Sequence, residues 1–293
     1  MSSMLKKNEI LVSIIIPVYN GINYIKSTIQ SILDQDYQPI ELIVVNDGST
    51  DGTKNYLDSL KLNNLKIIHT ENKGQSNAIN LGIEIANGSI VGYLSADDLI
   101  YSELVSSVIK ELSLSSESVC AYPNYNLIDQ NGKHIKSILI PDYSKKAMFE
   151  DLYCFPGPGA FFYKSHFMIL NGWDKRFSQI PDFEFWIRLS KYGEFVKINK
   201  ELASFRVHES SGSVKKISVR KSNEILILSN NLINEGWDSN KIKSKAYLIS
   251  SYHHLISKRF YVGIVYALKS VILNPHNLFR IEFYKHVFKG LLN

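Results

Sequence analysis

Four apolar segments rich in β-branched residues recur within the first 95 residues, and this alternation constrains the fold more than any other feature of the chain. In order, the segments read LVSIIIPVY, IELIVVND, LKIIHT and SIVGYLS. Stretches with apolar residues at helical spacing separate them, at 22–33, 49–60 and 75–86, and Ser49 or Thr50 is the expected cap of the second. Strands that alternate with helices in this way predict a parallel, doubly wound α/β sheet.

Charge is distributed unevenly and suggests a boundary within the 293 residues. Residues 216–293 hold 12 Lys and Arg against 4 Asp and Glu, whereas residues 1–215 hold 21 against 24. With 45% hydrophobic and 21% charged residues, the chain suffices for one large α/β domain or for a domain with an appendage. We therefore predict an α/β domain over 1–215 and a basic region over 216–293.

Cysteine usage and hydropathy indicate the compartment. The two cysteines, Cys120 and Cys154, fit a reducing cytosol better than a disulfide framework or a metal cluster, and we interpret both as core residues. No apolar run approaches the ~20 residues that span a bilayer. The first apolar run ends in Pro-Val-Tyr-Asn-Gly instead of a small-residue cleavage site, so it is better read as a strand than as a leader. These features predict a cytoplasmic protein.

Polar residues and glycines follow each of the four predicted strands. They occur at 17–21, 46–49, 72–74 and 95–98. Ligands of parallel α/β sheets bind beyond the carboxyl ends of the strands, so these residues mark the expected site. The chain has neither G-x-G-x-x-G after the first strand nor G-x-x-x-x-G-K-[ST], and a nucleotide would therefore be held mainly by side chains.

Two adjacent carboxylates, Asp97 and Asp98, stand at the end of the fourth strand. A hard divalent cation such as Mg²⁺ or Mn²⁺ takes one or two protein oxygens and completes its shell with water and phosphate, and it would relieve the repulsion between the two charges. The alternative is that Asp98 caps a helix that begins near Leu99 while Asp97 is solvated. The pair alone does not decide between these two interpretations.

The order of four motifs is more informative than any one of them: VSIIIPVYNG, ELIVVNDGSTDGT, ENKGQSNAINLGIEIANG and YLSADD. In this order they resemble the catalytic domain of family 2 glycosyltransferases, and the resemblance extends over about residues 10–212. It implies a GT-A fold, which is a Rossmann-like, mostly parallel sheet flanked by helices, with 216–293 as a C-terminal helical appendage. A nucleotide-sugar half is then expected at about 10–98 and an acceptor half at about 99–215.

The resemblance also implies which residues bind the donor. Asp47 would accept a hydrogen bond from the base, usually uracil, although NDGST also fits an Asx-turn. Lys73 matches the segment that closes over the base, and a solvated surface position is its equal alternative. SADD stands where the family has Asp-x-Asp, so Ser95 replaces the first carboxylate without adding charge, while Asp97 would hold the metal at the diphosphate. The implied donor-binding residues are Pro17, Tyr19, Asn20, Asp47, Lys73, Gly74, Asn77, Ser95, Ala96 and Asp97.

The stretch FSQIPDFEFWIRLSKYG carries the candidate catalytic base. Pro181 marks a helix start, and Asp182 lies in the first turn, where the helix dipole alone would favour a carboxylate. The stretch resembles the family's helix that opens with the catalytic aspartate, which implies Asp182 as the base and leaves Glu184 as the second candidate. Trp186 in the same helix is a candidate acceptor contact.

Three other features lie downstream of the fourth strand. FRVHESSGS resembles the family's Arg-x-His stretch and implies that His208 lies beside the diphosphate and the metal, whereas a lone His is more often structural. Asn131-Gly132 between alternating apolar runs predicts a β-hairpin. Gly159, in PGPGA, gives a close backbone approach that would suit either the floor of an acceptor pocket or a structural turn.

Together these residues predict an inverting glycosyltransferase that uses Mn²⁺ or Mg²⁺. Asp97 and His208 would neutralise the leaving diphosphate through the ion, and Asp182 would take the proton of the attacking hydroxyl. Only one base carboxylate is evident, so a single displacement that inverts the anomeric centre is expected. The expected partners are a nucleotide sugar, with UDP as the favoured nucleotide, and a glycan or lipid-linked glycan acceptor in surface-polysaccharide or glycoconjugate synthesis.

Two other classes of protein are alternatives. Ser95 is compatible with a catalytically silent sugar-nucleotide-binding or scaffold protein, because it removes a charge from the metal site. A sugar nucleotidylyltransferase would need a glycine-rich loop with Arg and Lys after the first strand, and PVYNGINYIKS lacks one.

The region 216–293 reads as three or four amphipathic helices with basic polar faces. Such helices would pack on the catalytic domain, pair with a second subunit, or lie on anionic lipid at the inner face of the cell membrane. Nucleic acid is not an expected partner, because the region has no recognisable reading motif. His253 and His254 are adjacent, so they face different sides of a helix and receive no ligand role.

Overall fold

The structure is a computed structural model that describes residues 10–209 and 219–279. It divides into two compact units, which we call the sheet unit (residues up to 143, 155–175 and 188–208) and the helical unit (144–154, 176–187 and 209 onwards). The helical unit includes the predicted C-terminal region and, in addition, two segments from earlier in the chain. The last predicted amphipathic segment, 280–293, lies outside the described residues.

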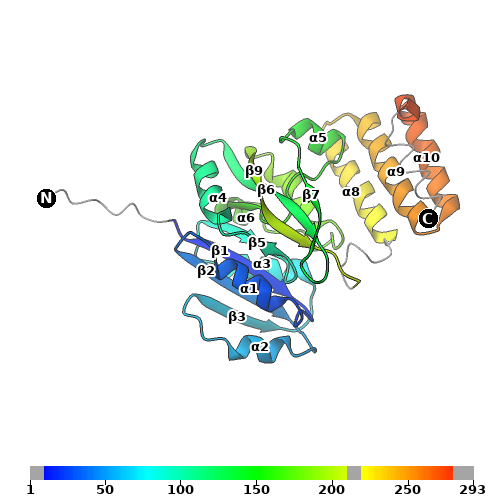
Figure 1. Cartoon of the computed structure of the whole chain (residues 1–293). Coiled ribbons are helices and arrows are strands. Elements are labelled where there is room, and N and C mark those ends of the chain that lie inside the picture. Colours follow the sequence, from blue (N-terminus) through cyan, green and yellow to red (C-terminus); the bar gives the residue numbers. More distant parts are fainter. Residues whose placement is uncertain (1–9, 210–218, 280–293) are drawn as a thin grey trace. The chain divides into compact units, whose positions relative to one another are not determined.

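The centre of the sheet unit is the predicted parallel arrangement of four strands (Figure 1). β1 (Val12–Val18) pairs with β2 (Ile40–Asp47) and with β4 (Ile90–Tyr93), and β3 (Leu65–Thr70) pairs with β2, all in parallel. Every residue of β1 and β2 is buried, as their uninterrupted apolar sequences require.

Helices cover both faces of this sheet, which confirms the doubly wound prediction. Ile14 and Ile16 of β1 belong to a core that also contains apolar residues of α1 (Ile25–Leu33) and α4 (Leu104–Ser113). The intervening Ile15 points the other way, because side chains alternate along a strand. It lies against Gly82 of α3 (Gln75–Ile85), where an added Cβ would come within 2.5 Å of it.

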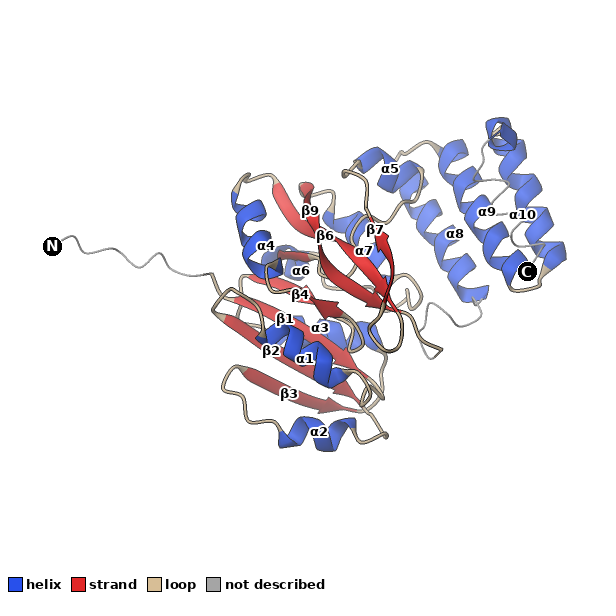
Figure 2. Cartoon of the chain, viewed as in Figure 1, coloured by secondary structure: helices blue, strands red, loops and turns tan. Residues whose placement is uncertain are grey.

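The remaining strands extend the sheet into a mixed one in the order β3-β2-β1-β4-β8-β6-β9-β5. Figure 2 shows the strands of this sheet in red and the helices in blue. β8 (Phe161–Tyr163) pairs antiparallel with both β4 and β6 (Ser118–Ile128), and β6 runs parallel to β9 (Glu194–Arg206). β5 (Leu99–Ile100) pairs antiparallel with β9. The short α6 (Lys164–Ile169) follows β8 directly.

The predicted hairpin is confirmed, with Asn131-Gly132 between β6 and the antiparallel β7 (His134–Ile138). Gly132 has a φ of +85°, a backbone conformation that glycine adopts without strain. The carboxylate of Asp129 accepts the amides of Asn131 and Lys133 and thereby closes the turn.

The predicted start of the second helix is wrong. α2 spans Thr53–Ser59, and Ser49 and Thr50 lie in the loop before it. The amide of Ser49 donates to the side chain of Asn46, and that of Thr50 donates to the side chain of Asn20. Asp51, rather than Ser49 or Thr50, accepts the amide of Thr53 in the first turn.

The helical unit contains the predicted C-terminal helices, α8 (Val219–Asn234), α9 (Ser239–Ile256), α10 (Phe260–Leu273) and the 3₁₀ turn η1 (Pro275–Phe279). α9 packs against both α8 and α10. His253 and His254, although adjacent in α9, are therefore both buried. The unit also includes α5 (Lys145–Glu150) and most of α7 (Pro181–Leu189).

The prediction that both cysteines are core residues is half wrong. Cys120 lies in β6 and is fully buried, whereas Cys154, in the loop after α5, is exposed. The segment around Cys154 forms neither a helix nor a strand.

A buried carboxylate joins the strands at their amino ends. Glu41 of β2 accepts hydrogen bonds from Ser13 Oγ of β1 at 2.6 Å and from the amide of Asn87 at 2.8 Å, and it pairs with Lys66 of β3 at 2.6 Å. Burial by itself raises the pKa of Glu41, but the hydrogen bonds from Lys66, Ser13 and Asn87 outweigh it, so the pKa is lowered.

We predict that Glu41→Gln lowers the free energy of unfolding by about 2 kcal/mol at neutral pH, because three donors lose a charged acceptor. A lowered carboxyl pKa stabilises the fold above the unfolded value of about 4.3 and loses this contribution as the pH falls through the folded value. The difference between wild type and variant in urea unfolding should therefore shrink in acid. Glu103→Gln, at the exposed pair Glu103–Lys200, is the control and should change the free energy of unfolding little. A stability difference between wild type and Glu41→Gln that does not vary with pH would contradict the prediction.

Candidate active site

The carboxyl ends of β1 and β2 are joined by their loops. The amide of Asn20 donates to Ser49 Oγ at 2.9 Å, and Asn20 Oδ1 accepts the amide of Thr50 at 2.7 Å. Asn20 has a φ of +54°, a conformation that Asn tolerates better than most residues. Tyr19, beside it, is 54% exposed, whereas Pro17 is buried in β1.

Asp47, at the end of β2, contacts the segment that follows β3. Its two carboxylate oxygens accept the amides of Lys73 and Gly74, each at 2.8 Å, and only 4% of the residue is exposed. The structure thus brings these three predicted donor residues together. Within NDGST it is Asn46 whose side chain accepts a nearby amide, that of Ser49 three residues on.

Lys73 and Asn77 lie at the start of α3. The Lys73 side chain is exposed, and its carbonyl accepts the side-chain amide of Asn77. Gly74 precedes α3 with a φ of +88°, so any other residue there would be strained.

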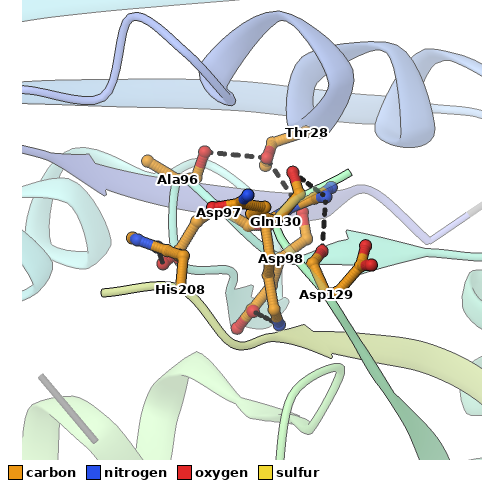
Figure 3. Close-up of polar contacts among 8 residues, drawn as sticks. Thr28, Ala96, Asp97, Asp98, Asp129, Gln130 and His208 are labelled. Carbon is orange, nitrogen blue, oxygen red and sulfur yellow. Dashed lines mark hydrogen bonds and ion pairs between the residues drawn. The ribbon is translucent and has the colours of Figure 1, made fainter. Parts of the chain in front are cut away.

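Asp97 lies directly beside His208. The distance from Asp97 Oδ2 to His208 Nε2 is 2.9 Å, and the two side chains are 29% and 11% exposed. The ring of Tyr24 lies 4.7 Å from that of His208. Asp97 and His208 therefore meet in the structure although they are 111 positions apart in the sequence (Figure 3). They are the two residues that the sequence analysis assigned to one metal.

Asp98 has a different role from either of those considered for it. It is 3% exposed and caps no helix, because β5 begins at Leu99 and α4 begins only at Leu104. Its Oδ1 accepts the amide of Arg206 at 2.9 Å. Burial and then the neighbouring Asp97 raise the pKa of Asp98 well above its ordinary value.

Thr28 of α1 holds the same segment from the other side. Its hydroxyl contacts the carbonyl oxygens of Ala96 at 2.9 Å and Asp98 at 2.8 Å (Figure 3). Ser95 accepts the amide of Asp98 through its carbonyl, which closes a tight turn over 95–98. The Asp97 carboxylate thus projects from a backbone that is fixed at both ends.

Arg206 is the residue of the sheet unit that the sequence prediction missed. Its Nε donates to the carbonyl of Asp97 at 2.7 Å, and its Nη1 reaches the carbonyls of Asp129 and Gln130, both at 3.3 Å. It lies two residues before His208, at the end of β9. The Arg-x-His pattern was the available signal, since residues i and i+2 of an extended chain share a face.

In the helical unit, Asp182 lies in the first turn of α7, as predicted. It is partly exposed, and its Oδ1 accepts the amide of Phe183 at 2.8 Å. Glu184, the second candidate, is only 6% exposed, and Trp186 is fully buried. Burial gives Trp186 a packing role here, and acceptor contact by this residue stays a prediction.

Glu224 of α8 binds the backbone that leads into α7. Its carboxylate accepts the amides of Ser178, Gln179 and Ile180 at 2.8–3.2 Å, and it is 3% exposed. Arg220, one turn earlier in α8, donates to it at 3.1 Å. No sequence pattern indicates this contact, because Glu224 stands in an ordinary amphipathic helix.

Gly159, the other acceptor candidate, is required by packing in the sheet unit. It has a φ of +80°, and an added Cβ would lie 3.0 Å from Leu104 and 3.1 Å from Ala203. This close approach explains the glycine without a ligand, and contact with an acceptor stays a prediction.

A divalent cation fits Asp97 and His208. They supply one carboxylate oxygen and one imidazole nitrogen, the ligand types that Mn²⁺ accepts, and leave the other positions to water and phosphate. No group of three or more His, Cys, Asp or Glu that could hold a metal is found among residues 10–209 and 219–279. An ion here would thus depend on ligands from the bound donor. None of the helices in these described ranges has the length and hydropathy that a bilayer span requires.

Comparison with known proteins agrees with the fold. The model of Glycosyl transferase family 2 matches residues 13–176. An uncharacterized glycosyltransferase of Rickettsia bellii is 35% identical over 216 residues, which are 71% of this chain and 31% of the relative. Hyaluronan synthase of Pasteurella multocida is 27% identical over 77% of this chain and 23% of its own length. The chain belongs to glycosyl transferase family 2 and spans less than two thirds of the length of these relatives.

Solved structures show the same GT-A fold. TarS 1-349 of S. aureus, in complex with UDP-GlcNAc, has a TM-score of 0.66 at 17% identity, over 96% of this chain and 79% of that chain. A mannosyltransferase of Pyrobaculum calidifontis, in complex with GDP-Man and Mn²⁺, has a TM-score of 0.62 at 15% identity, over 97% of this chain and 85% of that chain.

We predict that Arg206→Lys lowers the free energy of unfolding by about 2 kcal/mol, because a lysine cannot donate to the carbonyls of Asp97, Asp129 and Gln130 together. Thermal or urea unfolding measures the loss. Lys200→Gln, which removes a 61% exposed cation from the same strand, is the matched control. Equal stabilities for the two variants would contradict the role given to Arg206.

Proposed function

We propose that this chain transfers a sugar from a nucleoside-diphosphate sugar, with UDP as the favoured nucleotide, to a hydroxyl group of a glycan or lipid-linked glycan. Family membership supports the reaction class, and the solved relatives with UDP-GlcNAc and with GDP-Man support a nucleotide-sugar donor. The observation that carries the proposal is the contact between Asp97 and His208 at the carboxyl side of the sheet.

The residues of the sheet unit would bind the donor. Asn20 and Asp47 organise the loops after β1 and β2, and Lys73 and Gly74 lie on the segment that Asp47 holds. Asp97 and a neutral His208 would hold Mn²⁺ or Mg²⁺, since a histidine must be unprotonated to bind a metal. The ion, when bound, offsets the charge that develops on the leaving diphosphate. Ser95 contributes no charge, so the metal affinity of the protein alone would be low.

Asp182 is the proposed general base. The hydroxyl oxygen of the acceptor attacks the anomeric carbon as the bond from this carbon to the diphosphate breaks, and the proton moves to the Asp182 carboxylate. This single displacement inverts the anomeric configuration. Partial exposure makes Asp182 a better candidate than the buried Glu184.

A catalytically silent nucleotide-sugar-binding protein is the second candidate, and Ser95 in place of a first carboxylate is the observation that favours it. It differs from an enzyme in a simple way: it would bind a nucleotide sugar with Mn²⁺ and never turn it over.

We predict that a panel of UDP-, GDP- and dTDP-sugars with Mn²⁺ identifies a donor that the protein hydrolyses or transfers. Asp182→Asn should then lower turnover by about 10²–10⁴-fold, the usual contribution of a general base, and leave nucleotide binding unchanged. Asp97→Asn should weaken Mn²⁺-dependent nucleotide binding as well. Asp142→Asn, at a 90% exposed side chain, is the control. Full transfer by Asp182→Asn would exclude Asp182 as the base, and binding without turnover on every donor would favour the second candidate.

A further inference from the structure

Helix α10 is apolar on nearly every side. Its sequence is FYVGIVYALKSVIL, and its small residues Gly263, Ala267 and Ser270 are buried. Gly263 lies so close to Leu255 of α9 that an added Cβ would come within 2.6 Å of it. Apart from Lys269, the exposed side chains of α10 are large and apolar.

These outer side chains form a stripe. Tyr261, Ile264, Leu268 and Ile272 are 82%, 46%, 59% and 77% exposed, and their spacing of three and four residues places them on one face of the helix. A helix that is apolar all round is ordinarily buried, and a contiguous exposed apolar face marks an interaction site. We call these four residues the α10 stripe.

The surroundings of the stripe are basic. Residues 239–279 contain six Lys and Arg and no Asp or Glu. Lys258 and Lys269 are exposed, and Lys269 Nζ lies 5.5 Å and 5.7 Å from the ring centres of Tyr247 and Tyr266. One of the six, Lys241, is paired with Glu150 of α5. The segment that contains α9 and α10 therefore carries a positive net charge.

We propose that the α10 stripe docks on the surface of an anionic phospholipid bilayer. The apolar side chains would enter the boundary between headgroups and acyl chains, and Lys258 and Lys269 would reach the phosphates. A second copy of the chain fits less well, because a two-fold contact between two such faces would bring like charges together with no acidic residue of 239–279 to pair with them.

Co-sedimentation of the full chain with vesicles tests this proposal. We expect binding to phosphatidylcholine vesicles that contain phosphatidylglycerol, weak binding to phosphatidylcholine alone, and loss of binding at high salt. Lys258→Gln with Lys269→Gln should weaken binding by about tenfold or more, since each basic residue near an anionic surface contributes. Leu268→Ser with Ile272→Ser should abolish it, whereas Leu114→Ser, at a 68% exposed leucine of the sheet unit, should not.

Three outcomes would overturn the proposal. Equal binding to both kinds of vesicle, or to neither, excludes an anionic surface as the partner. A concentration-dependent dimer that Leu268→Ser with Ile272→Ser dissociates identifies a second copy as the occupant. A marked drop in melting temperature in that double variant, without vesicle binding in the wild type, indicates that another segment of the chain covers the stripe.

A separate observation concerns Glu224. Its carboxylate binds three consecutive amides, those of Ser178, Gln179 and Ile180, immediately before Pro181 begins α7. Proline has no amide hydrogen, so Pro181 itself donates no hydrogen bond at the start of α7. The amides that Glu224 binds are the last donors of the chain before the helix. A carboxylate at this place also interacts favourably with the amino end of the helix.

We infer that Glu224 is a positioning residue for Asp182, an inference that rests on the proposed role of Asp182 as the base. Asp182 lies two residues beyond the last amide that Glu224 binds. Rotation of the first turn of α7 would displace its carboxylate, and misplacement of a catalytic group by about 1 Å costs on the order of 10²-fold in rate.

Two measurements on Glu224→Gln and Glu224→Ala separate this inference from the proposed function. Hydrogen exchange at the amides of 178–180 should accelerate by at least about tenfold, whatever the role of Asp182. Turnover should fall by about tenfold or more in Glu224→Ala, with KM for the donor unchanged and a smaller loss in Glu224→Gln. Glu235→Gln, at an exposed glutamate beyond α8, is the matched control.

Unchanged exchange in Glu224→Ala would overturn the structural part of the inference. Accelerated exchange with unchanged turnover would overturn the catalytic part, and Asp182→Asn would then show whether the base assignment itself is at fault. A rise in KM with unchanged turnover would place Glu224 in substrate binding instead and would also contradict the inference.

Discussion

The hydrogen bonds that Arg206 makes with Asp97 and Asp98 join two segments of the chain that lie more than 100 residues apart. The amide of Arg206 donates to the carboxylate of Asp98, and its guanidinium donates to the carbonyl of Asp97. His208 is two residues further along, so its distance from the Asp97 carboxylate depends on these bonds. The contact between the end of β9 and the turn after β4 therefore determines whether the candidate metal ligands meet at all.

Buried carboxylates serve this chain mainly by accepting backbone or side-chain donors. Glu41, Asp47, Asp98 and Glu224 are each less than 8% exposed, and each accepts at least one backbone amide. Hydrogen bonds to its oxygens lower the cost of burying a carboxylate. They do not offset it at Asp98, where burial and the neighbouring Asp97 raise the pKa. Asp97 and Asp182, the candidate metal ligand and the candidate base, are partly exposed. Burial thus separates the four structural carboxylates from these two candidates where sequence position does not.

The sequence predicted the parallel half of the sheet well, because four apolar segments with helical spacers have few alternatives to a parallel, doubly wound sheet. It predicted the meeting of Asp97 and His208 only through the family resemblance, since no periodicity connects positions so far apart. It failed where the answer depends on tertiary contacts. Asp98 is a residue type that commonly caps helices, but in the structure β5 follows it and its carboxylate accepts the amide of Arg206. Ser49 is also a common capping residue, but it lies in a loop where its amide donates to Asn46.

The helical unit was the least predictable part for a related reason. The family model ends at residue 176, where a segment of this unit begins, so Asp182 lies beyond the part of the chain that defines the family. That segment contacts α8 through Glu224, and α5 contacts α9 through the pair of Glu150 with Lys241. The C-terminal helices therefore bind the backbone from which the candidate base projects. Sequence variation in these helices could alter turnover without changing any residue that contacts the donor.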